Sequence, residues 1–135
     1  MKKIIITSVL VMLCVAFSNA QNVATSKIQW NVTKTFNALA GESDQIPQKF
    51  IVDRTNIIQW VDIHDNLKFN FTIVSQTGTW SNVNTPGGVQ YDVDVNGVRG
   101  KVEITRTSAG ISIRVNIFMD EPQIYELTIS DVQVL

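Results

Sequence analysis

Polar and apolar residues alternate most regularly between positions 89 and 105. Every second residue from Val89 to Val95 is apolar or aromatic, and the alternation resumes at Val98 after the pair Asn96-Gly97. A period of two is typical of a strand that buries one face. An Asn-Gly pair between two such runs favours a type I′ turn, because that turn requires positive φ at both central residues. The pattern therefore predicts a β-hairpin.

A two-residue turn also fixes how the two strands of this hairpin pair. It places apolar residues opposite one another on one face and opposite charges together on the other face. A shift of one residue would reverse both faces, so the register is strongly specified. The predicted pairs are Val95 with Val98, Val93 with Gly100, Tyr91 with Val102, Val89 with Ile104, Asp94 with Arg99 and Asp92 with Lys101.

Similar runs predict further strands on both sides of the hairpin. These strands are expected over residues 28–32, 50–52, 57–63, 67–73, 80–83, 111–117 and 124–135. Turns are expected over residues 53–56, 64–66, 109–110 and 120–122. The turn at Ala109-Gly110 would place Ile104 opposite Val115 and Thr105 opposite Arg114. A change of phase after Ile129 predicts a β-bulge near Ser130-Asp131.

Two segments are less regular. In the run 57–64 we expect Val61 and Ile63 to lie on one face and Ile58, Trp60, Asp62 and His64 on the other. Trp60 is therefore a candidate for an exposed contact residue or a residue at the rim of the barrel. Residues 36–46 fit a helical turn, a short strand or a loop.

The composition supports an all-β protein. Residues 21–135 contain 14 Val, 13 Ile and 11 Thr but only 4 Leu and 4 Ala. Branched side chains pack well on a pleated sheet, whereas Leu and Ala favour helices. Eight or nine strands joined by short turns predict an antiparallel up-and-down meander that closes, or nearly closes, into a barrel, because closure removes exposed edges. A β-sandwich is the alternative.

The N-terminal segment is typical of a secretory signal peptide. Lys2 and Lys3 precede an apolar run, and a small-residue cleavage site ends at Ala20. We therefore expect residues 1–20 to be removed and residues 21–135 to form one exported domain, secreted or periplasmic. The single cysteine, Cys14, lies within the apolar run, and Leu13 before it disfavours lipid attachment.

Charge and cysteine content exclude several function classes. Residues 21–135 carry 9 Lys and Arg against 12 Asp and Glu, a net charge of −3, without a basic cluster. This disfavours a nucleic-acid partner, whose phosphates require clustered positive charge. With no cysteine after residue 20, disulfides and thiolate metal sites are not expected.

Two motifs suggest chemistry that their context does not support. Residues 92–103 match the spacing of a calcium-binding EF-hand loop, but they lie in the predicted hairpin instead of between two helices. His64, the only histidine, lies in a predicted polar turn, where Asp and Asn are favoured. We therefore predict no catalytic residue, no metal site and no cofactor.

The aromatic residues are the remaining functional signal. Large rings either fill the core or line a pocket for an apolar ligand. The candidate ligand-binding residues are Trp30, Trp60, Phe69, Phe71, Trp80 and Tyr91.

Two further motifs carry a family resemblance. Gly78-Thr79-Trp80 forms a G-x-W motif, and the chain closes with Tyr125-Glu126-Leu127 and residues 132–135 after a run of hairpins. In these features the chain resembles the small lipocalin-like (calycin-type) domains that bacteria secrete. The resemblance implies a barrel with an apolar-binding interior.

The sequence thus predicts an exported, non-catalytic barrel that binds a small apolar or aromatic ligand. The alternative is a protein-interaction module, such as an inhibitor or surface-adhesion domain, with a filled core. We expect no membrane span after residue 20. A ligand barrel should enclose a cavity of roughly 300 Å³ or more, whereas an interaction module should have a solid interior and an exposed apolar patch.

Overall fold

The computed structural model describes residue 23, residues 26–53 and residues 56–135, and the expected signal peptide with Cys14 lies outside them. The described residues form β-strands connected by turns and loops. The strands are β1 (Lys27–Asn37), β2 (Glu42–Asp44), β3 (Gln48–Asp53), β4 (Ile57–Asp62), β5 (Leu67–Thr77), β6 (Gly87–Val95), β7 (Val98–Thr107), β8 (Gly110–Ile117) and β9 (Gln123–Val134).

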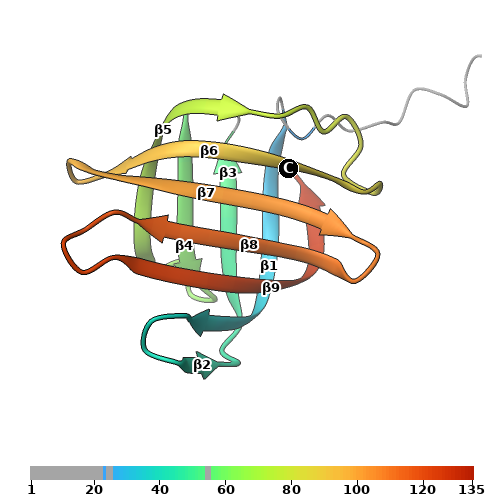
Figure 1. Ribbon diagram of the computed structural model, residues 1–135. Coiled ribbons are helices and arrows are strands. Elements are labelled where there is room, and N and C mark those ends of the chain that lie inside the picture. The colour runs from blue at the N-terminus through green and yellow to red at the C-terminus, as the bar shows by residue number, and fades with distance from the viewer. Residues whose placement is uncertain (1–22, 24–25, 54–55) are drawn as a thin grey trace, which may run out of the picture.

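Eight of these strands close into an antiparallel barrel. Each strand from β3 to β9 pairs with the next, while β1 pairs with both β3 and β9. The short strand β2 pairs with the end of β1 and lies at one end of the barrel (Figure 1). The strands β6–β9 cross in front of β1, β3 and β4 (Figure 1). The predicted meander barrel is therefore confirmed, and the sandwich alternative is wrong.

The central hairpin has the predicted register throughout. Val95 pairs with Val98, and the pairing continues without a shift to Gly87 opposite Arg106. In the turn Asn96 has φ 51° and Gly97 has φ 86°, as a type I′ turn requires. The alternation buries Tyr91, Val93 and Val102 completely.

The predicted register of the next hairpin is wrong by two residues. Ile104 pairs with Ile113 instead of Val115, and Thr105 pairs with Ser112 instead of Arg114. The two residues between the strands are Ser108 and Ala109, and Gly110 with φ 125° begins β8. The turn therefore lies one residue earlier than predicted and has the same length of two residues. Because the pairing shifts by two residues, the predicted faces of both strands are kept.

The structure defines the predicted bulge near Ser130 and the segment 36–46, for which the sequence left three possibilities. Asn31 pairs with Asp131 and Val32 pairs with Ile129, which leaves Ser130 as the extra residue of the predicted bulge. Residues 36–46 complete β1, turn at positions 38–41 and form β2, so of the three possibilities the short strand is confirmed.

The predicted strand containing Trp80 and Val83 is wrong. Residues 78–86 form a loop between β5 and β6, yet both side chains are buried. Their spacing of three does not follow the alternation of a strand, and they are buried because the loop folds across the end of the barrel.

Side chains fill the barrel interior. The largest fully buried residues include Trp30, Trp60, Tyr91, Phe50 and Phe71. Branched residues from every long strand complete the core around them. In the described part of the chain, no helix has the length and apolar character needed to cross a membrane.

Candidate binding site at the mouth of the barrel

The two ends of the barrel differ in how they are covered. At the end we call the closed end, the loop 78–86 and residue Val23 cover the interior, and the Val23 amide donates a hydrogen bond to the Trp80 carbonyl at 3.0 Å. The opposite end, which we call the mouth, is surrounded by the turns 38–41, 63–66, 96–97 and 118–122 and by β2. The mouth is therefore the candidate entrance.

Trp80 anchors the closed end. Its ring stacks on Trp30, with 5.7 Å between centroids and 23° between planes. Its Nε1 donates to the Thr85 carbonyl at 3.0 Å, so the indole is satisfied within its own loop. Arg106 Nη1 donates to the Val83 carbonyl at 3.3 Å and ties the loop to β7. These contacts hold Trp80 in place, and we call the loop 78–86 with its Trp80 side chain the plug of the closed end.

Three aromatic side chains gather just inside the mouth. The Trp60 centroid lies 5.5 Å from Phe69 and 5.3 Å from Tyr125, and Phe69 lies 6.1 Å from Tyr125. We call Trp60, Phe69 and Tyr125 the mouth aromatics. Trp60 is fully buried while Phe69 and Tyr125 are partly exposed, so the cluster joins the core to the surface.

The prediction that Trp60 is an exposed contact residue is wrong, although Trp60 does lie near the rim of the barrel. Trp60 and Ile58 are fully buried, whereas Ile63, predicted on the opposite face, is 51 % exposed. Trp60 pairs with Phe69, and Ile58 pairs with Phe71, so the aromatic face of β5 determines which face of β4 turns inward. Both faces of β4 carry apolar residues, and pairing with β5 determines which of these faces is buried.

A β-bulge turns Lys68 over the mouth aromatics. Trp60 pairs with Phe69 but Val61 pairs with Leu67, so Lys68 is the extra residue on β5. A bulge commonly changes the direction of a side chain. Here Lys68 Nζ lies 4.3 Å from the Trp60 centroid and 5.3 Å from that of Tyr125, within the range of cation–π attraction.

Polar contacts hold the Trp60 ring in place. Its Nε1 donates to Gln48 Oε1 at 2.5 Å, and Thr35 Oγ1 donates to the same oxygen at 3.5 Å. Thr35 is itself only 4 % exposed. The indole therefore has a satisfied polar edge, while the Lys68 ammonium lies over its ring.

A hollow of about 290 Å³ lies beside this cluster. Its walls come from β1, β2, β5 and β9. The residues that line it are Thr35, Asn37, Glu42, Ser43, Asp44, Lys68 and Tyr125. Two carboxylates, one ammonium, three hydroxyls and an aromatic ring thus meet at the mouth.

Partial burial affects both ionisable groups that face the aromatic side of the hollow. Removal of water lowers the pKa of Lys68, and the nearby Asp44 carboxylate acts in the opposite direction. Burial raises the pKa of Tyr125. Both shifts favour the neutral forms, as expected where side chains lose contact with water.

Two polar atoms in the barrel interior lack a hydrogen-bond partner among the described residues. These are Trp30 Nε1 and the Tyr91 hydroxyl. Burial raises the pKa of Tyr91 to about 12, because the phenolate form would be poorly solvated. A buried donor without a partner is costly, so both atoms are suited to an internal water molecule or a ligand.

The predicted aromatic residues do not form one site. Trp30 and Trp80 stack at the closed end, whereas Trp60 and Phe69 belong to the mouth. Phe71 packs between Phe50 and Phe69 in the core. Tyr91 is fully buried on β6.

Sequence reasoning missed the other residues of the mouth, chiefly Lys68, Tyr125, Asp44 and Gln48. Nothing near Lys68 in the sequence marks the bulge. Asp44 lies in a segment for which three structures remained open.

Acidic residues in and beside the two excluded motifs form structural hydrogen bonds in turns and between strands. Asp94 Oδ1 accepts a hydrogen bond from the Gly97 amide at 2.9 Å, and Asp92 Oδ2 accepts one from Ser75 at 2.8 Å. Asp62 accepts hydrogen bonds from the side-chain amide of Asn66 and from the backbone amides of Asn66 and His64, and these bonds lower the pKa of Asp62. No group of three or more His, Cys, Asp or Glu suited to a metal occurs among the residues described.

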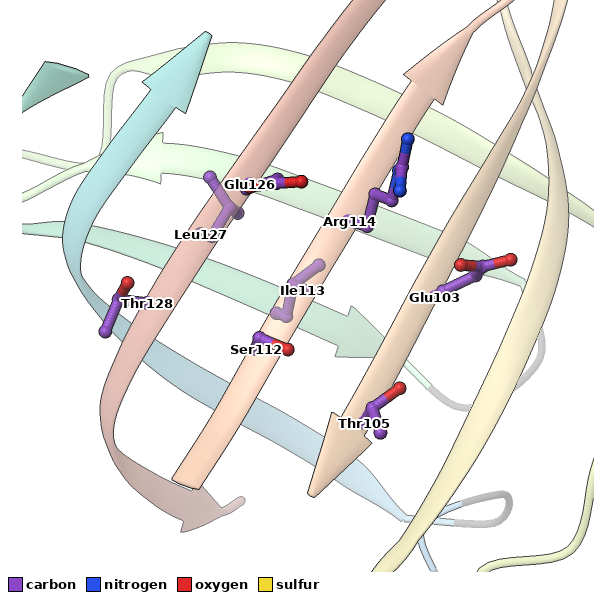
Figure 2. Close-up of a pocket in the computed structure, with 8 residues that line it drawn as sticks. All are labelled: Glu103, Thr105, Ser112, Ile113, Arg114, Glu126, Leu127 and Thr128. Carbon is purple, nitrogen blue, oxygen red and sulfur yellow. The ribbon is translucent and has the colours of Figure 1, made fainter. Parts of the chain in front are cut away.

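A larger hollow of about 440 Å³ lies on the outer face of β7, β8 and β9 (Figure 2). Glu103 pairs with Arg114, and Arg114 pairs with Glu126, so opposite charges lie side by side across three strands. Figure 2 shows Arg114 between the two glutamates. This surface is a polar sheet face, and no aromatic side chain lines the hollow on it.

Comparison of the chain with models of protein families, with curated proteins and with solved structures finds no match. The fold alone defines the class of protein, which is an eight-stranded antiparallel β-barrel with one additional short strand.

Proposed function

We propose that this chain is an exported, non-catalytic barrel of lipocalin-like type that binds a small ligand with an apolar or aromatic group at its mouth. The observation that carries the proposal is the hollow of about 290 Å³ beside Trp60, Phe69 and Tyr125, at the end opposite the Trp80 plug. Ligand sites typically combine aromatic walls with a few polar groups that fix orientation.

The interior is filled, as we expected of an interaction module and not of a barrel that encloses its ligand, so a small ligand would bind at the mouth and not at the centre. Trp30, Phe50, Phe71 and Tyr91 leave no exposed surface in the middle of the barrel. A ligand at the centre would have to displace these rings, whereas a ligand at the mouth needs only to move Lys68 or to contact Tyr125. A ligand that extends from the mouth into the barrel interior could form a hydrogen bond with the unpartnered Tyr91 hydroxyl.

Export is supported by the sequence of residues 1–20 alone. Lys2 and Lys3, the apolar run and the small residues before position 21 match a secretory signal. An exported ligand-binding barrel without disulfides would depend on its packed core for stability, which agrees with the number of fully buried rings.

A protein-interaction module is the second candidate. It is favoured by six large apolar side chains on the loops and strand ends that surround the mouth, each at least 47 % exposed. They are Leu39, Ile46, Ile63, Leu67, Phe118 and Met119. Leu39 and Met119 line one hollow of about 450 Å³ between the β1–β2 turn and the β8–β9 loop. Exposed apolar groups at one end are typical of a surface that contacts a protein.

Native mass spectrometry of the protein purified from its own host tests the two candidates. We expect a bound small molecule that is retained by Tyr125→Phe, which keeps the ring, and lost in Tyr125→Ala, which removes it. A mass without small molecule but with a stoichiometric protein partner would support the interaction module. A mass with neither, in protein that is folded by circular dichroism, would refute ligand binding.

A further inference from the structure

The mouth of the barrel already holds an ammonium group, that of Lys68. The group lies over the faces of Trp60 and Tyr125 at 4.3 and 5.3 Å from their centroids. Lys68 forms no ion pair with a carboxylate among the described residues, in contrast to Lys49, which pairs with Asp65 at 3.1 Å. The rings are therefore its principal partners.

The position of Lys68 follows from the backbone and not from a network of polar contacts. In regular pairing, Lys68 would point away from the face that carries Leu67 and Phe69. The bulge opposite Trp60 and Val61 breaks that alternation. Much of the Lys68 side chain is exposed, so its flexible stem can move into water without any change in the strands. A ligand can therefore take its place on the rings.

The charges around the rings select the kind of ligand. Glu42 and Asp44 line the same hollow and bring two negative charges, while Lys68 brings one positive charge. When Lys68 moves away, the hollow combines two carboxylates with the faces of two aromatic rings. Such a set attracts an organic cation and repels an anion.

We propose that the mouth of the barrel is a binding site for an organic ammonium group, which displaces Lys68 from Trp60 and Tyr125 and is balanced by Glu42 and Asp44. Lys68 is then a built-in competitor that weakens binding until a ligand displaces it. This assignment rests on the proposed ligand-binding function and specifies the charge of the ligand. The lowered pKa of Lys68 agrees with it, because partial loss of water makes the bound ammonium easier to displace.

The test compares two molecules of nearly the same shape. Choline carries a trimethylammonium group, and 3,3-dimethyl-1-butanol replaces its nitrogen with carbon and has no charge. Each is titrated into ¹⁵N-labelled protein while NMR follows the Trp60 indole N–H. We expect choline to move this resonance at concentrations where the neutral alcohol does not, because only the cation gains from the ring faces and the carboxylates.

Variants then test the roles of the charged residues. Lys68→Ala should tighten choline binding about tenfold by removing the competitor. Lys101→Ala, which removes a positive charge from the outer face of β7, should change it less than about twofold, because charges far from the mouth are screened. Asp44→Asn should weaken choline binding about threefold and leave the neutral alcohol unchanged.

The proposal is overturned if Lys68→Ala binds choline no more tightly than the unchanged protein, or if the neutral alcohol binds as well as choline. Failure of this proposal and failure of the proposed function are distinguishable. A neutral molecule bound in native mass spectrometry, without a gain in choline affinity, refutes the ammonium preference and keeps the ligand-binding function. If native mass spectrometry finds no bound molecule, and choline binds neither the unchanged protein nor Lys68→Ala, the ammonium preference and the ligand-binding function are both refuted.

Discussion

Gly87 leaves room for the indole of Trp80. A Cβ atom built on Gly87 would lie 2.7 Å from Trp80 Nε1, a separation that Cβ atoms essentially never show. The first residue of β6 thus lacks a side chain where the plug of the closed end packs against it. The position of Trp80 over Trp30 depends on this absence.

We expect Gly87→Ala to lower the free energy of unfolding by about 1–3 kcal/mol, because the methyl group would push the Trp80 ring away from Trp30. Urea denaturation followed by tryptophan fluorescence measures this change. Ser81→Ala, at an exposed position of the same loop, is the control and should change stability by less than about 0.5 kcal/mol. Equal stability of the two variants would show that the plug does not require close packing at Gly87.

The type I′ turn gives a second prediction. Asn96 has φ 51°, which costs an ordinary L-residue about 1 kcal/mol, so Asn96→Ala should destabilise the barrel by about that amount. Asn96→Gly, which tolerates positive φ, should stay within about 0.5 kcal/mol of the original. Thermal unfolding by circular dichroism compares the two. A loss that is the same for alanine and glycine would assign the effect to the Asn side chain instead of the backbone.

The hairpin of β6 and β7 could be predicted fully because its information is local. The turn pair Asn96-Gly97 and the alternation on both sides specify one register, and a shift by one residue would expose the apolar face. The bulge at Ser130 was also predicted, because the change of phase between Ile129 and Val132 is visible within one strand.

The mouth could not be predicted because its geometry is set by pairing between strands. The inward face of β4 depends on the register against Phe69 and Phe71, and the bulge at Lys68 has no local sequence signal. Tyr125, from the last strand, meets Trp60 only when the barrel closes through β1. Residues distant in sequence therefore form the site, and their alternation alone does not show which of them meet.

The buried hydroxyl of Tyr91 gives a third prediction. It has no hydrogen-bond partner among the described residues, so Tyr91→Phe should raise the free energy of unfolding by up to about 1 kcal/mol. Tyr125→Phe is the matched control. It removes a hydroxyl that donates to Gln123 Oε1 at 3.1 Å and should lower stability by about 0.5–1 kcal/mol. A loss of more than about 1 kcal/mol in Tyr91→Phe would mean that an internal water or ligand satisfies the hydroxyl.

Tyr91 also predicts how stability changes at high pH. Its pKa is about 12 in the folded barrel because of burial, and the value of an exposed tyrosine is near 10. Since the folded value is the higher one, the contribution of Tyr91 is fully present below pH 10 and is lost as the pH rises from about 10 to about 12. The loss from this one group is at most about 1.4 kcal/mol per pH unit. Urea midpoints measured from pH 8 to pH 12 should fall less steeply for Tyr91→Phe than for the unchanged protein, and parallel curves would show that the phenol does not remain neutral inside the barrel.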